Sequence, residues 1–175
     1  ANAAAAAQAD RTLAEAWRSR RAYPLVVTQG DGNLGVKGKN FEMLFSIAGA
    51  GPASLKENGT EWLWRAPRPA FWRASTDNDR GCGFPLRAAA WMAADVVVTY
   101  NGMKVLEAGP DCVKVQFQFG IPTVSGASAE LVYTVEAQGA LRVDAVYHGV
   151  AGAPELPCFG VKFETFGPVT RTVWT

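Results

Sequence analysis

The chain has 175 residues, 49% hydrophobic and 19% charged, which is long enough for one domain with its own core. Its net charge is +1 and its basic residues are scattered, so we expect neither nucleic acid nor a membrane surface as a partner. No run of about 18 apolar residues predicts a membrane-spanning helix. The three cysteines are far apart and lack C-x-x-C spacing, so the sequence supports neither a disulfide framework nor a metal site.

The first 22 residues differ in composition from the rest of the chain. They are alanine-rich and then charged, with Asp10 as a candidate N-cap and with Leu13 and Trp17 on one helical face. We interpret residues 1–22 as a linker or N-terminal helix and residues 23–175 as a β domain. The chain begins without methionine and ends within an apolar, strand-like run, which favours a fragment of a larger protein.

A hairpin is predicted at the start of the β domain. Residues 24–28 and 34–37 are typical of short strands, and the Asp-Gly pair between them is a turn signal. Gly30, Gly32 and Gly35 also match the G-x-G-x-x-G fingerprint of dinucleotide binding. Because no helical pattern follows these glycines, we expect no dinucleotide cofactor.

The next strands carry large apolar side chains at alternating positions. Phe41, Met43 and Phe45 point to one face, as in a half-buried strand. Trp62 and Trp64 lie on one side of a later strand. Either core packing or a sugar-binding platform explains these two tryptophans, and core packing is the favoured interpretation.

The stretch from residue 71 to residue 83 concentrates groups that suit a polyhydroxylated ligand. Aromatic rings stack on the C–H faces of a sugar, and carboxylates such as Asp77 and Asp79 accept hydrogen bonds from its hydroxyls. The alternative is that Asp77, Asn78 and Asp79 only shape a turn. Two prolines stiffen the preceding extended segment, so we expect residues 76–83 to be a loop presented from a rigid base.

The second half of the chain predicts one short helix and then a series of strands. Pro85 is placed for the first turn of a helix over residues 86–94. Strands are predicted at residues 96–100, 104–108, 112–119, 129–137, 141–147 and 159–166. The expected fold class is therefore all-β, an antiparallel β-sandwich with one short helix after the loop of residues 76–83. His148, the only histidine, is interpreted as a turn residue.

Four sequence features occur in an order that resembles a known family. They are an F-x-x-x-F strand at residues 41–45, the turn N-G-T-E ahead of W-L at residues 58–63, the stretch P-A-F-W-R-A-S-T-D-N-D-R-G at residues 69–81, and L-P-C-F-G-V-K-F at residues 156–163. Together they resemble the C-terminal small-chain domain of family-2 glycoside hydrolases of the bacterial β-galactosidase type. Ser75 and Cys158 depart from the family pattern, which has proline and arginine there.

The resemblance implies a fold, the location of the catalytic residues and a role for the loop. The fold would be the first part of a galactose-mutarotase-like β-supersandwich that lacks its later strands. The catalytic glutamates would lie on a separate (β/α)₈ barrel, so no catalytic residue is expected here. Parent enzymes of this type often use Mg and Na in other domains, and no cofactor is expected in this chain. The substrate-entrance loop would comprise Asp77, Asn78, Asp79, Arg80, Gly81 and Gly83, with Gly81 as its pivot.

Trp72 and Arg73 precede this loop, and Asp77 and Asp79 are a pair of carboxylates within it. Trp72 and Arg73 are candidates for contacting the sugar or for anchoring the loop, and spacing suggests an ion pair between Arg73 and Asp77. A retaining glycosidase needs two carboxylates about 5 Å apart, a distance that Asp77 and Asp79 allow in an extended segment. We nevertheless reject this pair as catalytic, because the family places its glutamates on the barrel.

Three functional hypotheses follow. The first is a non-catalytic domain of a β-galactosidase that hydrolyses terminal β-D-galactosyl residues, with the remaining domains, above all the barrel, as partners and a galactoside substrate only in the intact enzyme. The second is a stand-alone carbohydrate-binding module that uses Trp62, Trp64, Phe71 and Trp72. The third is a structural spacer in a homo-oligomer. The sequence leaves localisation open, with the cytoplasm favoured.

Overall fold

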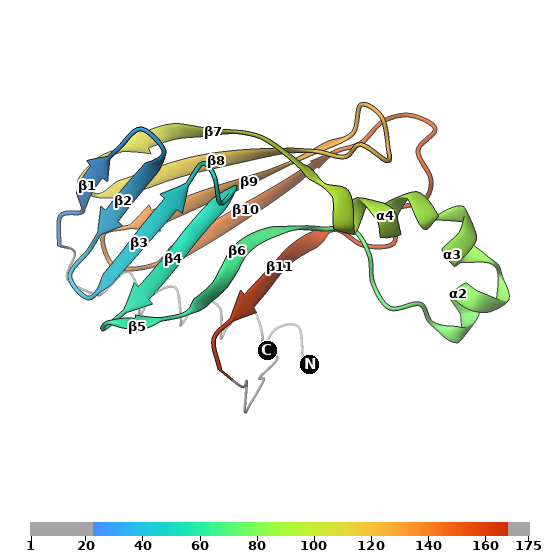
Figure 1. Cartoon of the computed structure of the whole chain (residues 1–175), viewed down its shortest axis with the longest axis horizontal. Helices are drawn as coiled ribbons and strands as arrows, with labels where there is room; N and C mark the ends of the chain where they lie inside the picture. The colour runs from blue at the N-terminus through green and yellow to red at the C-terminus, as the bar shows by residue number, and fades with distance from the viewer. Residues whose placement is uncertain (1–22, 168–175) are drawn as a thin grey trace, which may run out of the picture.

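The computed structural model describes residues 23–167, which form two packed antiparallel sheets and a two-stranded ribbon (Figure 1). The first sheet follows the sequence order: β1 (Val26–Gln29), β2 (Asn33–Lys37), β3 (Phe41–Ser46), β4 (Gly51–Glu57) and β5 (Thr60–Glu61). The second sheet contains β7 (Thr99–Ala108), β8 (Cys112–Gly120), β9 (Ser128–Glu136) and β10 (Leu141–His148). The ribbon pairs β6 (Leu63–Ala70) with β11 (Gly160–Thr165). The predicted all-β, antiparallel class is confirmed.

The core lies between the two sheets, on the faces that the alternating patterns predict. Phe45 of β3 is fully buried, and its ring centroid lies 6.2 Å from that of Phe117 and 5.8 Å from that of Tyr133. The strands of the second sheet contribute every second residue to the same cluster: Val113, Val115, Phe117, Leu131, Tyr133 and Val135. This packing makes the two sheets a sandwich, as predicted.

Left-handed backbone conformations close the tight turns. Asn58 and Gly59 have φ of 50° and 81°, as a two-residue hairpin turn between β4 and β5 requires. Gly139 has φ of 89° in the turn between β9 and β10. The glycines of the G-x-G-x-x-G match belong to the hairpin of β1 and β2, which no helix follows.

Glu61 fastens the turn between β4 and β5. Its Oε1 atom accepts hydrogen bonds from the backbone N–H groups of Leu55 at 2.9 Å and of Trp62 and Leu63 at 3.1 Å each. Its Oε2 atom accepts a hydrogen bond from the hydroxyl of Ser54. Burial raises the pKa of Glu61, but these donors together lower it below its usual value. The carboxylate in the N-G-T-E motif therefore has a structural role.

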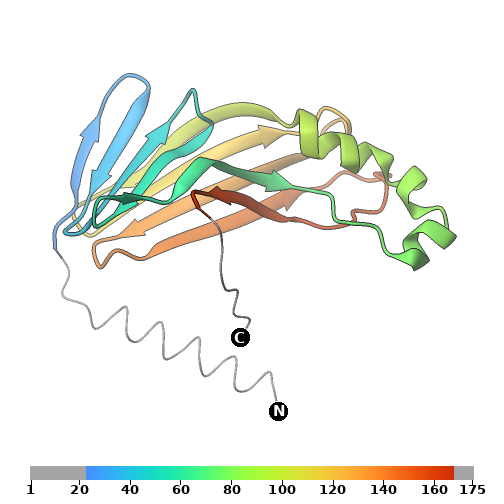
Figure 2. The same ribbon diagram turned by 60° about the horizontal axis from the view of Figure 1, so that its bottom comes forward.

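Three short helices follow β6, where the sequence predicted one. They are α2 (Asp77–Gly81), α3 (Phe84–Arg87) and α4 (Ala89–Val97), and they extend beyond one end of the sheets (Figures 1 and 2). The strand predicted at residues 96–100 begins too early, because α4 continues to Val97 and β7 (Thr99–Ala108) starts at Thr99. Trp91 and Ala94 bury one face of α4, and this packing outweighs the β propensity of the valine run. A single strand, β7, then spans the rest of the two predicted strands.

Two expectations from the sequence concern the chain ends and a membrane-spanning helix. The linker or helix at residues 1–22 and the apolar chain end lie outside residues 23–167. Within the described range, no helix is long and apolar enough to cross a membrane.

Candidate functional site

An aromatic cluster fixes the base of the stretch that the sequence singled out. Phe71 is fully buried, and its ring centroid lies 5.8 Å from Trp91, 5.9 Å from Phe159 and 6.5 Å from Tyr147. These four residues come from the position directly after β6, from α4, from β10 and from the segment before β11. Phe71 is therefore a core residue, and its proposed part in a sugar-binding platform is wrong.

Two hydrogen bonds, each between a side chain of α4 and a backbone group, connect α4 to the segments around this cluster. The N–H of Phe71 donates to Oδ1 of Asp95 in α4 at 2.9 Å. The indole N–H of Trp91 donates to the carbonyl oxygen of Pro154 at 3.0 Å. The chain consequently leaves the sandwich toward α2 from a fixed point.

The segment predicted as a loop, residues 76–83, begins with a helix whose N-terminus is capped by a side chain. Thr76 is the N-cap of α2: its hydroxyl accepts a hydrogen bond from the N–H of Asp79 at 3.2 Å, and its own N–H donates to Oδ2 of Asp79 at 2.8 Å. This reciprocal pair is a capping box, with Asp in the place of the more common Glu. The prediction that residues 76–83 form a loop is wrong for Asp77–Gly81, because Thr76 and Asp79 together initiate a helical turn.

Arg73 holds this helix against the rest of the domain. Its Nη1 and Nη2 atoms donate to the two carboxylate oxygens of Asp79 at 2.6 Å and 3.2 Å, and its Nε donates to the carbonyl oxygen of Pro157 at 3.2 Å. The predicted ion pair of Arg73 with Asp77 is wrong, since Asp77 pairs with Arg80 at 3.2 Å. Residues two apart in a helix lie about 200° apart around its axis, so only one of the two carboxylates faces Arg73.

Electrostatics keeps the Arg73 and Asp79 pair charged. The Arg73 guanidinium and the N–H of Thr76 hold the pKa of the Asp79 carboxyl well below its usual range. The Asp79 carboxylate in turn raises the pKa of Arg73. Asp79 therefore remains ionised at neutral pH and acts as an anchor, which assigns Arg73 to the loop-anchoring role predicted as one of its alternatives.

The tip of the projection is open to solvent. No residue of α2 is buried, and the side chain of Asp77 is 97% exposed. Gly83 has φ of 69°, a left-handed value that ends this segment and begins α3, whereas a Cβ added to Gly81 would meet no atom within 4 Å. The role of Gly81 as a pivot stays a prediction.

Trp62, Trp64 and Trp72 lie in different environments. Trp62 and Trp64 are 49% and 57% exposed, so the favoured interpretation of core packing is wrong for both. Trp64 makes an edge-to-face contact with Phe166, at 4.9 Å between ring centroids. Trp72 is half-buried beside the aromatic cluster that contains Phe71. With Phe71 in the core, the predicted four-residue platform does not exist, which disfavours the carbohydrate-binding module.

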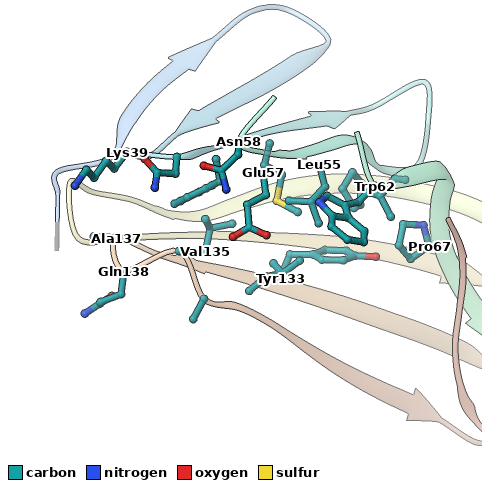
Figure 3. A pocket seen from close by; sticks show the side chains of 18 of the residues that line it. Lys39, Leu55, Glu57, Asn58, Trp62, Pro67, Tyr133, Val135, Ala137 and Gln138 are labelled. Atoms are coloured by element: carbon teal, nitrogen blue, oxygen red, sulfur yellow. The ribbon is translucent and has the colours of Figure 1, made fainter. Parts of the chain in front are cut away.

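The structure also reveals a groove that sequence analysis did not predict. The groove has a volume of about 790 Å³ and opens between the first sheet and the β9–β10 hairpin (Figure 3). Glu57 is the only carboxylate among its lining residues in the described part of the chain. Most of its lining lies within residues 39–43, 52–67, 133–141 and 163–165, and it includes Asn58 and Trp62 of the turn motif at residues 58–63.

The remaining candidate ligands and nucleophiles within residues 23–167 are the acidic side chains, His148 and the three cysteines. No group of three or more His, Cys, Asp or Glu side chains in this range is placed to hold a metal ion. His148 ends β10 and is not in a turn, and its Nε2 lies 3.4 Å from Oε1 of Glu130. The three cysteines are free.

The described residues define a two-sheet antiparallel β-sandwich domain with an arginine-anchored helical projection at one end. Residues 37–175 match the family described as β-galactosidase small chain, and the chain belongs to that family.

The relatives that the chain matches include a small subunit and longer β-galactosidases. The chain is 40% identical over 169 residues to the β-galactosidase small subunit of Latilactobacillus sakei, a match that covers 86% of this chain and 53% of that protein. It is 34% identical over 148 residues to a β-galactosidase of Clostridium acetobutylicum and 38% identical over 140 residues to one of Streptococcus thermophilus. These matches cover 85% and 80% of this chain but 16% and 14% of the two enzymes. The chain thus spans about half or less of the relatives it matches.

Proposed function

We propose that this chain is a non-catalytic domain of a family-2 β-galactosidase that hydrolyses terminal β-D-galactosyl residues. In this proposal the catalytic carboxylates lie on a separate barrel domain, and the α2 projection shapes the entrance to the active site. The Mg and Na ions that enzymes of this type often use would belong to other domains.

The anchored projection is the observation that carries the proposal. Arg73, Asp79 and Pro157 fix the base of α2, while Asp77 and Asn78 at its tip are exposed. A tip that is rigidly supported and polar can contact a sugar or a neighbouring domain without first losing conformational freedom. This geometry favours a contact role over that of a passive spacer.

The protonation states support a non-catalytic role. The acid of a retaining glycosidase needs a raised pKa and a second carboxylate about 5 Å away. Asp79 has a lowered pKa and is held by Arg73. The groove of Figure 3 contains Glu57 as its one carboxylate in the described residues.

A chimera tests the proposal. The region of the S. thermophilus β-galactosidase that matches this chain would be replaced by this chain, and hydrolysis of o-nitrophenyl β-galactoside would be measured. We expect simultaneous replacement of Asp77, Asn78 and Asp79 by alanine to lower kcat/KM about ten- to a hundredfold, because small displacements at an active-site entrance have effects of this size. Asp31→Ala, in an exposed turn between β1 and β2, is the control and should leave kcat/KM unchanged.

Two results would contradict the proposal. Unchanged kcat/KM in the triple variant would favour a spacer. Hydrolysis by the chain alone, abolished by Asp77→Ala, would place catalysis in this domain.

A further inference from the structure

Helix α4 is apolar on both of its faces. Its sequence, AAWMAADVV, includes one polar side chain, that of Asp95. Asp95 belongs to the inner face of the helix, where its Oδ1 atom accepts the hydrogen bond from the N–H of Phe71. Trp91 and Ala94 on the same face are fully buried. A helix that is apolar all round is covered on every side in a folded protein, but the domain covers only the inner face of α4.

The outer face of α4 leaves apolar side chains in contact with solvent. Val96 is 76% exposed and Met92 is about half exposed, and because they are four residues apart they are neighbours on the helix surface. Val97 borders them and is also about half exposed. Leu86 of α3, the helix directly before α4, is 84% exposed. We call these four residues the outer apolar face.

The extent of the outer apolar face distinguishes it from ordinary surface. Single apolar residues scattered over a surface need no partner. Four side chains exposed to this degree make an apolar patch of roughly 300–400 Å², which is comparable with the largest patch on a typical monomer and is often an interaction site. The outer apolar face therefore has the size and composition of an interaction surface.

The size of this surface also decides between two partners. A second copy packed face to face would bury roughly 600–800 Å² in total, which is below the about 1,200 Å² of a specific, stable interface. Interfaces between domains of one polypeptide are as small as about 600 Å², because the connecting chain keeps the two domains at a high local concentration. The outer apolar face lies on helices and offers no free strand edge, so its partner is a packed surface of a neighbouring domain.

The relatives contain enough additional polypeptide for such a domain. The match covers 16% of the C. acetobutylicum β-galactosidase and 14% of the S. thermophilus enzyme, so most of each enzyme lies outside the match. The outer apolar face also belongs to the same projection as α2, beyond one end of the sheets (Figures 1 and 2). A domain that α2 reaches would therefore meet α3 and α4 as well.

We propose that the projection formed by α2, α3 and α4 docks on the barrel domain of the parent β-galactosidase through Leu86, Met92 and Val96. These side chains pack against an apolar surface of the barrel domain. Apolar contacts of α3 and α4, rather than ion pairs of α2, then hold the polar tip of α2 at its position. The inference rests on the proposed function, because it needs a parent enzyme with a separate barrel domain.

Hydrogen exchange in the chimera tests the docking. The chimera with the S. thermophilus enzyme and the isolated chain would be compared by mass spectrometry of peptides that cover residues 84–97. We expect these amides to exchange at least about tenfold more slowly in the chimera, because the docked surfaces must separate before α3 and α4 can open. Val96→Glu should return exchange to the rate of the isolated chain, because it places an unpaired charge in an apolar interface.

Val26→Glu is the matched control. Val26 is also a valine with an exposed side chain, at 61%, but it lies in β1 at the opposite end of the domain from α4 (Figure 1). We expect this variant to keep the slow exchange of residues 84–97. Circular dichroism of the isolated chain would verify that both variants are folded.

Three results would overturn the inference. They are equal exchange in the chimera and in the isolated chain, equal effects of the two substitutions, and a dimer of the isolated chain that Val96→Glu dissociates, because a second copy would then occupy the face. The exchange measurement is separate from activity. Slow exchange at residues 84–97, together with unchanged kcat/KM in the Asp77, Asn78 and Asp79 triple variant, would support the docking and contradict only the role at the active-site entrance.

Discussion

Replacement of Phe71 by alanine should strongly destabilise the domain. The side chain is fully buried and contacts the rings of Trp91, Tyr147 and Phe159. Removing a buried phenylalanine ring loses its transfer free energy and leaves a cavity, which together cost about 3–5 kcal/mol. Typical domains have a free energy of unfolding of about 5–15 kcal/mol, so the variant should keep only a small part of this free energy or a reduced one.

Urea denaturation followed by circular dichroism measures this effect. With an m-value of about 2 kcal/mol per molar urea, a loss of about 4 kcal/mol lowers the transition midpoint by about 2 M. Trp64→Ala is the control: Trp64 is 57% exposed, and its replacement should change the free energy of unfolding by less than about 1 kcal/mol. A Phe71→Ala midpoint within about 0.5 M of the parent chain would refute the view that the aromatic cluster fixes the base of α2.

Three further predictions concern polar and backbone features. Glu61→Gln should lower the free energy of unfolding by about 1–2 kcal/mol at pH 7. Because the folded state lowers the pKa of Glu61, its stabilising contribution is present at neutral pH and is lost as the pH falls below about 5, which urea titrations at several pH values would show. Gly83→Ala should destabilise by about 1–2 kcal/mol because Gly83 is left-handed, whereas Gly81→Ala should be neutral or slightly stabilising in thermal melts. Arg73→Ala should raise the pKa of Asp79 toward its usual value, measured by carboxyl NMR, and an unchanged pKa would contradict the ion pair.

The sequence predicted the strands well because their alternating patterns reflect a local cause. In β8 and β9, every second residue faces the core, and the observed bounds differ from the predicted ones by a residue or less. The first hairpin was also predicted, because its two strands flank a short polar and glycine-rich turn, although neither Asp31 nor Gly32 adopts a left-handed conformation.

Two of the failures have a different cause, which is packing between distant segments, and one comes from a local signal that the prediction missed. The exposure of Trp62 and Trp64 depends on which strands cover the ribbon of β6 and β11, and strand composition does not reveal this. The pairing of Arg73 with Asp79 depends on α2 being helical, and the capping box with Asp79 in place of Glu was not recognised as a helix start. Val96 and Val97 are exposed, and they are helical against their own preference because Trp91 and Ala94 bury one face of α4.

The order of strands has a consequence for how the chain folds. Both sheets join strands in the order in which they occur in the sequence, so hairpins of this kind can form on a timescale of about microseconds. The pairing of β6 with β11 joins the middle of the chain to its far end and requires closure of a much longer loop. We expect this ribbon to form last. The exposed aromatic residues that it carries would then be the last to find their neighbours during folding.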